Sequence, residues 1–583
     1  MFLLLIQGAS RFSHRRLFGG YRTVTPEEQV HAERIRARLL GCLEKSLLRD
    51  SARQLQERLA SKNAIPKNKS YSMSLEITSG TYSTKDGWED PVDEPSNREI
   101  LRAIEPVEAF SSQLSAPSED EVASVFTALE VLYALLTDGA KRHQVAVDSG
   151  WSHLAWACKR IAHWSGLRCD RKFGIKTRQF LIECSTKRKP EFDEEWEKSF
   201  EKITSWGSPA ARIDAAAGLL ILAERETCVS EEVLATIGTL SHDQVSAVRF
   251  QVASNLLALY ATNLDFMWSL AEKIAERDSS VSVLNTRLNS VLGQLAGAQP
   301  DRVFDLVKVI LHRTADREAG ELRRDAHSLV EGLYVYRGHA PSEALVREVV
   351  NAMHEHPSDA RDLVGPLRSA IIYGSNQEED TQVRQRALAL MLELLQRAQT
   401  GLDSITQSQS GVPWTEWEQS AQKTAQKLAQ LVNDVCSQVY FASGAFELGQ
   451  GGKDAAEAPS VEIRIRLYNE ASELLDQLVG VSLPEGIHHV ISTLEIYIDH
   501  EPKDVFLRIA RTVRKNVQSG YQNESLAEAL IVRIVQRYLA DHRSMLREED
   551  ACRTALIELL ETFVRAGWPS ARQLTYRLEE IFR

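Results

Sequence analysis

One twelve-residue pattern, repeated through the middle of the chain, decides the fold. It reads VRFQVASNLLAL at Val248–Leu259, with apolar residues at the first, fifth, ninth and twelfth positions. These positions fall on one face of a helix with 3.6 residues per turn. Further copies are Ala211–Leu222 (ARIDAAAGLLIL), Leu284–Leu295 (LNTRLNSVLGQL) and Leu322–Leu333 (LRRDAHSLVEGL). The pattern predicts a row of amphipathic helices.

The four copies are evenly spaced. Their second residues are Arg212, Arg249, Asn285 and Arg323, at steps of 37, 36 and 38 residues. A period of this length indicates a stacked helical array, because one helix pair cannot bury its apolar stripe without neighbours. The sequence therefore predicts an all-α solenoid of stacked antiparallel helix pairs, with a less regular N-terminal region.

Partner helices are readable between the copies. We expect them at Glu231–Leu240, Leu264–Glu276 and Asp301–Leu311, each upstream of a stripe helix. A fifth copy, Val383–Leu394 (VRQRALALMLEL), lies farther away, so an additional helix pair is expected at Ser342–His354 and Asp359–Tyr373.

An Asp-containing turn precedes the second copy, in the run Asp243-Gln-Val-Ser-Ala-Val248-Arg249. Such a turn, followed by a hydrophobic residue, Arg and the apolar stripe, resembles the HEAT and armadillo-type helical repeats over residues 200–400. In that family the Asp and the Arg commonly form ladders between neighbouring repeats. The resemblance therefore implies that Asp243 and Arg249 are scaffold residues. Asn285 departs from the Arg pattern, so no rung of the ladder is implied there.

Breaks in the helical pattern divide the chain into five parts. We expect residues 1–98 to hold a basic tail, a helix and an irregular or hairpin segment, and 99–205 to be helical with a basic stretch. Residues 206–400 should form the repeat array. Residues 401–460 should be a linker, a long helix and a flexible loop, and 461–583 divergent helical repeats.

Composition limits the functional classes. The chain has 583 residues, of which 43% are hydrophobic, and its formal net charge of −12 disfavours wrapping nucleic acid with the whole surface. Seven scattered cysteines predict reduced thiols and a cytoplasmic setting. No segment has the apolar length of a transmembrane helix, so no membrane partner is expected. The acid-free residues 1–26 are interpreted as a basic tail, with a transit peptide as the less favoured alternative.

The sequence contains no recognisable catalytic motif. It lacks the HExxH zinc motif and a phosphate loop of the required spacing, and no Ser/His/Asp or Cys/His set can be assembled from linear spacing. A thiol- and imidazole-rich set has intervals that match no common zinc module: His153, Cys158, His163, Cys169 and Cys184. We therefore predict no catalytic residues, metal or other cofactor, and buried thiols in place of a zinc site.

Ten Lys or Arg residues gather between Lys159 and Lys189, opposed only by Asp170 and Glu183, which gives a local charge of +8. Tryptophans lie within this basic stretch and just before it, and charge interleaved with aromatic residues is typical of a nucleic-acid contact. The interpretation that we favour is neutralisation within the fold by the acidic run Glu191–Glu201. If a polyanion-binding patch exists, its residues are Arg168, Arg171, Lys172, Lys176 and Arg178.

Three classes of function remain, and we predict the first, a non-catalytic scaffold that binds a protein partner. The stretch Val248–Trp268 is similar to helical-repeat regions of large bacterial ATP-binding proteins, some tied to defence systems, which implies the recognition part of a larger assembly. This chain lacks their nucleotide-binding motifs. The alternative is a nucleic-acid-binding or DNA-repair HEAT-like protein that uses residues 159–189. The third class is an enzyme whose site is assembled from residues distant in sequence.

Overall fold

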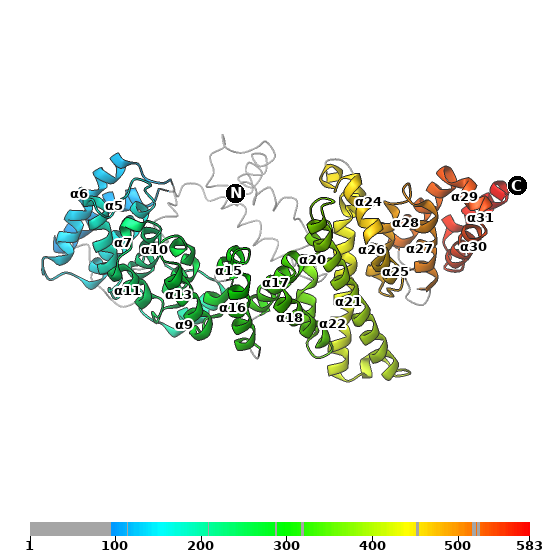
Figure 1. Cartoon of the computed structure of the whole chain (residues 1–583), viewed down its shortest axis with the longest axis horizontal. Helices are drawn as coiled ribbons and strands as arrows, with labels where there is room; N and C mark the ends of the chain where they lie inside the picture. The colour runs from blue at the N-terminus through cyan, green and yellow to red at the C-terminus, as the bar shows by residue number, and fades with distance from the viewer. Residues whose placement is uncertain are drawn as a thin grey trace, which may run out of the picture. The chain divides into compact units, whose positions relative to one another are not determined.

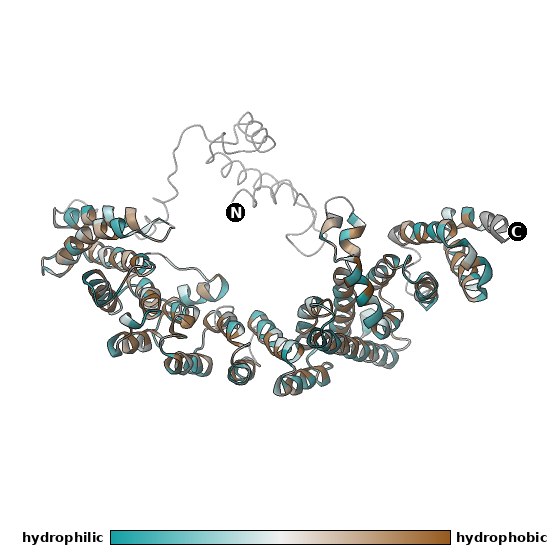
Figure 2. Ribbon diagram, turned by 45° about the horizontal axis from the view of Figure 1, so that its top comes forward, coloured by the Kyte–Doolittle hydropathy of each residue, from teal (hydrophilic) through white to brown (hydrophobic). Residues whose placement is uncertain are grey.

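Stacked α-helices make up the part of the chain that the computed structural model describes (Figure 1). It describes residues 95–582, apart from 114, 208, 286–288, 316–319, 451–453, 516–520 and 522–524. No β-strand occurs in these ranges, which confirms the predicted all-α class. Hydrophilic and hydrophobic segments alternate along individual helices, as amphipathic helices require (Figure 2). The predicted basic tail, N-terminal helix and hairpin lie outside the described residues.

The helices before the repeat array are α5 (Pro95–Ser111), α6 (Glu119–Thr137), α7 (Gln144–Ala162), α8 (Lys172–Cys184) and α9 (Glu194–Lys202). Helix α6 begins with a capping box: the Ser118 hydroxyl accepts from the Glu121 amide at 3.3 Å, and the Glu121 carboxylate accepts from the Ser118 amide at 2.7 Å. Helix α7 packs against α5, α6, α8 and α10, so it is the centre of this part of the core. None of these helices, nor any other described one, is both long and apolar enough to cross a membrane.

The repeat array has the predicted helix pairs. Its elements are α10 (Ala211–Ala223), η4 (Glu226–Cys228), α11 (Glu231–Leu240), α12 (Ser246–Ser254), η5 (Leu256–Leu259), α13 (Leu264–Arg277), α14 (Val281–Val283), α15 (Asn289–Leu295), α16 (Pro300–Arg313), α17 (Gly320–Arg337), α18 (Ala340–Asn351), α19 (Pro357–Asp362) and α20 (Val364–Ala370). The expected partner helices correspond to α11, α13 and α16. The stripe residues of the second copy are fully buried: Val248, Val252, Leu256 and Leu259. Their burial confirms that the stripe faces the core.

The pattern predicts one continuous α-helix for the second copy, but the structure divides it into α12 and the 3₁₀ turn η5. The side-chain amide of Asn255 donates to the carbonyl of Gln251 at 2.7 Å, and the Asn255 backbone amide bonds to Val252 instead. An Asn side chain that takes the carbonyl four residues back competes with the helix ladder. The chain therefore tightens into the 3₁₀ turn η5, which keeps Leu256 and Leu259 in the core. Of the third copy, Asn289–Leu295 forms α15, and α14 (Val281–Val283) lies just before its first residue.

The remaining elements are α21 (Glu378–Ser408), η7 (Trp414–Glu416), α22 (Gln419–Ala442), α23 (Ala445–Gln450), η8 (Asp454–Glu457), α24 (Val461–Glu470), α25 (Ser472–Leu478), α26 (Pro484–Glu495), α27 (Pro502–Lys515), α28 (Ser525–Asp541), α29 (Arg543–Glu548), α30 (Asp550–Arg565) and α31 (Pro569–Phe582). The linker expected from residue 401 is wrong at its start, because α21 continues to Ser408. Gly401 is buried where a β-carbon would lie only 3.1 Å from Leu428 of α22, so close helix packing extends past the predicted break.

One pair of cysteines departs from the expectation of reduced thiols. Cys169, just before α8, is joined by a disulfide to Cys228 in η4, across 59 residues of sequence. The stacking of α8, α10 and α11 brings these two residues together. The other described cysteines are free and buried: Cys158, Cys184, Cys436 and Cys552.

A buried carboxyl group lies in the middle of the array. Glu331 of α17 is fully buried, and neither of its carboxyl oxygens has a hydrogen-bond partner. Burial raises the pKa of Glu331 to about 8, since a carboxylate loses its hydration in apolar surroundings. The folded protein therefore holds a proton that the unfolded chain releases near the ordinary value of 4.5.

We expect this proton to make stability pH-dependent. The contribution of Glu331 is fully present below about pH 4.5 and is lost as the pH rises through 8, by about 1.4 kcal/mol per pH unit in that window. Glu331→Gln should therefore gain stability relative to the wild type as the pH rises from 5 to 9, in thermal denaturation followed by circular dichroism. Glu355→Gln, on an exposed turn, is the control. A constant difference between Glu331→Gln and the wild type at all pH values would contradict the raised pKa.

Candidate functional site

A ladder of Arg–carboxylate pairs joins successive repeats. Its rungs are Arg212–Asp243 (2.7 Å), Arg249–Asp278 (2.8 Å), Arg323–Asp359 (2.6 Å) and Arg384–Glu470 (2.7 Å). The ladder confirms the scaffold role that the family resemblance implied for Asp243 and Arg249. At Asn285, where the Arg is missing, the buried side-chain oxygen has no hydrogen-bond partner among the described residues.

Arg249 shows what one rung does. Its guanidinium donates to both carboxylate oxygens of Asp278, at 2.8 and 3.1 Å, and to the carbonyl of Asp243 at 2.7 Å. Asp278 also accepts from the backbone amide of Ser280 at 2.9 Å, immediately before α14. One side chain thus fixes the turns of two neighbouring repeats against each other. Because the pair is mostly buried, loss of the Arg would leave an uncompensated carboxylate.

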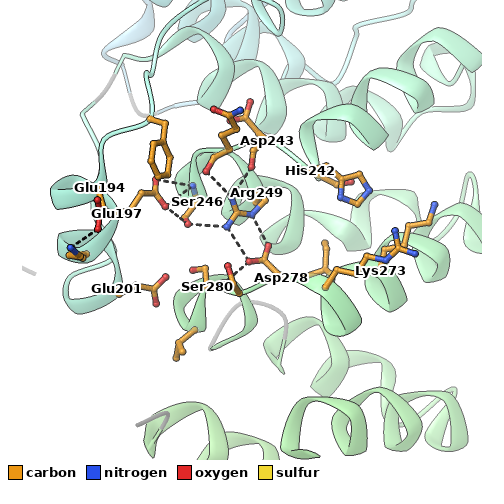
Figure 3. Close-up of a pocket in the computed structure, with 18 residues that line it drawn as sticks. Glu194, Glu197, Glu201, His242, Asp243, Ser246, Arg249, Lys273, Asp278 and Ser280 are labelled. Atoms are coloured by element: carbon orange, nitrogen blue, oxygen red, sulfur yellow. Dashed lines mark hydrogen bonds and ion pairs between the residues drawn. The ribbon is translucent and has the colours of Figure 1, made fainter. Parts of the chain in front are cut away.

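Helix α9 caps the two repeat helices that begin beside this ladder (Figure 3). Glu197 accepts from the backbone amide of Ser246 at 3.1 Å and from its hydroxyl at 2.5 Å, at the start of α12. Glu201 accepts from the backbone amide of Ser282 at 3.0 Å, in α14. Amides in the first turn of a helix have no intrahelical acceptor, and that end carries partial positive charge. The two carboxylates therefore stabilise both helix starts from outside the repeats.

Aromatic rings and one rung of the ladder hold α9 in place. Phe200 is 1% exposed, and its ring centroid lies 5.7 Å from that of Trp196 and 5.8 Å from that of Phe250. Trp206 lies 5.7 Å from Phe250. Arg212 donates to the carbonyls of residues 187, 188 and 190, in the segment that leads into α9. Helix α9 is thus held in a fixed position against the repeats.

An open cavity of about 730 Å³ lies between α9 and the turns of the repeats. Figure 3 shows Glu194, Glu197 and Glu201 on one side of it and His242 and Lys273 on the other. Arg277 also lines the cavity, one helical turn after Lys273. We name this space, with its acidic and basic walls, the α9 cleft.

The two walls of the α9 cleft differ in how far their charges are satisfied. The carboxylates all have partners. Glu194 pairs with Lys198, and Glu197 and Glu201 accept hydrogen bonds from the helix starts. Asp243 and Asp278 pair with arginines of the ladder. Within the described part of the chain, His242, Lys273 and Arg277 make no ion pair and no side-chain hydrogen bond. The spare binding capacity of the cleft is therefore cationic and lies opposite α9.

The predicted polyanion-binding residues lie elsewhere, in α8 and the segment just before it, and none lines the α9 cleft. Arg168 pairs with Asp170 at 2.8 Å, and Lys172 approaches Glu130 at 3.6 Å. The Lys176 ammonium stands 6.0 Å from the centre of the Phe180 ring. Among the described residues, Arg171 and Arg178 form no ion pair.

Other cations of the basic stretch serve the fold. Lys159 pairs with the buried Asp214 at 2.5 Å, and the buried Arg160 donates to Gln113 at 2.9 Å. From the acidic run, Glu191 pairs with Arg188 and Lys189. The expected neutralisation by the whole run is wrong for Glu197 and Glu201, because α9 turns these residues toward helix starts. A signal for this orientation was available in the sequence: Trp196 and Phe200 are four residues apart, as are Glu197 and Glu201, so an aromatic face and an acidic face lie side by side on one helix.

The thiols and imidazoles that resembled a zinc set have separate environments. Cys169 is in the disulfide, His153 shares a hydrogen bond with the Ser149 carbonyl at 2.8 Å, and His163 is exposed at the end of α7. Burial raises the pKa of the Cys158 and Cys184 thiols far above the ordinary value, so both stay neutral.

Among the residues that the structure describes, His327, Asp359 and Asp362 have potential ligand atoms within 4.8 Å of one another. Sequence reasoning missed this group, because α17 supplies the His and α19 supplies both Asp. Asp359 already pairs with Arg323 of the ladder at 2.6 Å. This group is therefore part of the contact between repeats.

No family model matches the chain, and no curated protein sequence is similar to it. Similar solved structures include an engineered protein (14% identity, 81% of this chain and 97% of that chain, TM-score 0.17). A homology model of the full-length AP-3 complex in an intermediate open conformation matches at 10% identity (91% and 99%, TM-score 0.22). A circular tandem repeat protein with novel repeat topology and enhanced subunit contact surfaces matches at 13% (83% and 96%, TM-score 0.22). At these TM-scores the matches carry no argument, and the repeat assignment rests on the helix pairs and the ladder.

Removal of one partner from a rung of the ladder should strongly destabilise the fold. Arg249→Ala leaves Asp278 without its bidentate partner, which should cost about 3–5 kcal/mol. Arg249→Lys should recover little, since an ammonium cannot reproduce the two-pronged geometry. The matched control is Arg565→Ala, which removes an exposed pair with Glu561 worth about 0–1 kcal/mol. Equal shifts of the urea midpoint for Arg249→Ala and Arg565→Ala would refute the role of the ladder.

Proposed function

We propose that this chain is a non-catalytic helical-repeat scaffold, and that the α9 cleft binds a charged peptide segment of a protein partner. The observation that carries the proposal is the arrangement of charges in the cleft. Glu194, Glu197 and Glu201 form one wall, and Lys273 and Arg277 lie opposite with no counter-ion among the described residues.

The chemistry of the two walls defines the segment. An acidic side chain facing Lys273 and Arg277 would form charge-assisted hydrogen bonds. Each carboxylate of α9 keeps further lone pairs beyond those that its present partners use, so it can accept from a basic side chain or a backbone amide. A segment of a single charge sign would be repelled by one of the walls. The expected segment therefore carries both acidic and basic residues.

The proposal includes a place in a larger assembly, as its recognition part. The support is the resemblance of Val248–Trp268 to repeat regions of large bacterial ATP-binding proteins, some tied to defence systems. The same stretch, with α12, η5 and the start of α13, borders the α9 cleft through Arg249.

The test is site-specific crosslinking in cells that express the intact chain. A photoreactive amino acid at Gln244, an exposed residue of the cleft, should capture the partner segment, to be identified by mass spectrometry. Lys273→Glu/Arg277→Glu should reduce the captured amount at least tenfold, because it reverses the basic wall. The control, Lys308→Glu/Lys423→Glu, makes the same charge change on exposed faces of α16 and α22. Equal capture by both double variants would rule out the cleft.

A second candidate function is nucleic-acid binding through α8, and Arg171 and Arg178 are the observation that favours it. Arg171 is exposed and Arg178 half-exposed, and both lack an ion pair among the described residues, close to Lys172 and Lys176. These four cations, on one short helix and the residue just before it, could contact phosphate groups.

A salt titration distinguishes this second candidate. If the cations contact phosphates, affinity for DNA or RNA falls with salt, and each contact contributes a slope of about −0.9 on logarithmic axes. Arg171→Glu/Lys172→Glu should then flatten the slope and weaken binding, measured by fluorescence anisotropy. Identical weak binding by this variant and the wild type at every salt concentration would retire the nucleic-acid function.

A further inference from the structure

The helical hairpin α21–α22 ends in an exposed aromatic turn. Figure 1 shows its two long helices side by side. Between Ser404 and Gln422, every hydrogen bond of the described side chains stays within the hairpin, and no ion pair leaves it. Nearer the core, by contrast, Gln399 bonds to Gln477 and Lys427 to Ser358. The turn thus contributes little to the stacking of the repeats.

This turn, residues 411–418, which we name the hairpin tip, has a defined conformation. The Trp417 indole nitrogen donates to the carbonyl of Val412 at 3.0 Å, and the Gln422 amide donates to the carbonyl of Trp414 at 2.6 Å. The rings of Trp414 and Trp417 lie 4.7 Å apart. The hydrogen bonds and the ring contact present Trp414 in one orientation.

The hairpin tip exposes apolar area. Trp414 is 45% and Val412 41% exposed, next to Pro413 and the half-buried Trp417. Exposed area of this kind is unfavourable in water, and tryptophans dominate the binding energy of protein interfaces when a partner pocket buries them. A preorganised ring also loses little conformational entropy on binding.

The charge around the tip selects the kind of partner. Asp403, Glu416 and Glu418 are exposed, and no Lys or Arg occurs from Ala398 to Gln422. Nucleic acid and anionic lipid would be repelled by these carboxylates. A complementary surface is apolar at its centre and basic at its edge.

We propose that the hairpin tip is a second docking site, in which Trp414 inserts into an apolar pocket on a partner protein whose rim carries Lys or Arg side chains. Glu416 and Glu418 pair with that rim and set the orientation. This site is independent of the α9 cleft, which is built from other repeats.

The test uses the full chain with a photoreactive amino acid at Thr415 and a labelled 18-residue amphipathic peptide of Leu and Lys as the probe. The peptide presents an apolar stripe edged by basic side chains. We expect saturable crosslinking at physiological salt, reduced at least tenfold by Trp414→Ala and at least threefold by Glu416→Gln/Glu418→Gln. Tyr260→Ala removes another exposed aromatic ring and should leave crosslinking within twofold of the wild type.

Several results would overturn the proposal. Equal crosslinking by wild type and Trp414→Ala would show that the tryptophan is not part of the contact. Equal crosslinking of a Leu/Glu peptide would show that the partner needs no basic rim. Self-association in sedimentation that Trp414→Ala abolishes would identify a second copy as the occupant. Binding to phosphatidylcholine vesicles that depends on Trp414 would identify a membrane. Lys273→Glu/Arg277→Glu should retain crosslinking from the tip, so failure of the cleft and failure of the tip remain distinguishable.

Discussion

The rest of the structure depends on the paired guanidinium and carboxylate groups between neighbouring repeats. Burial of apolar stripes drives the helices together, but burial alone has little directional preference. Each rung adds direction. The five donors of the planar Arg249 guanidinium are divided among the Asp278 carboxylate, two carbonyls of the preceding turn and the Ser246 hydroxyl, so the two turns have one relative position. The stripe supplies most of the free energy, and the ladder selects the geometry.

The same constraint creates the α9 cleft. Because successive turns are held in line, the starts of α12 and α14 lie close enough for one nine-residue helix to cap both. Glu197 and Glu201 are then committed to backbone amides, and the ladder carboxylates to guanidinium groups. What remains for a ligand is the cationic side of the cleft together with the outer lone pairs of α9. A structural element thus becomes one wall of a binding site.

Charge is divided among distinct regions of this protein. Folding separates the basic stretch, which looks like one patch in the sequence, into buried cations such as Arg160, locally paired cations such as Arg188, and Arg171 and Arg178, which form no ion pair with any residue that the structure describes. The hairpin tip is acidic and aromatic, and the α9 cleft carries both signs. The proposed sites therefore select different partner surfaces.

The sequence by itself determined the helical period and the partner helices, and its resemblance to helical repeats implied Asp243 and Arg249 as ladder residues. The prediction of Glu231–Leu240 agrees with α11 at both ends, and Asp243 and Arg249 take the roles implied for them. These features are local, since the residues that form a stripe, a cap or a turn all lie within one helix pair. Only the tertiary structure decided the partners of Glu197 and Glu201, which lie 49 and 81 residues away, and the joining of Cys169 to Cys228. It also decided that α21 continues past residue 401. The reason is physical: such contacts depend on how whole helices stack, and many stackings are compatible with the same local periodicity.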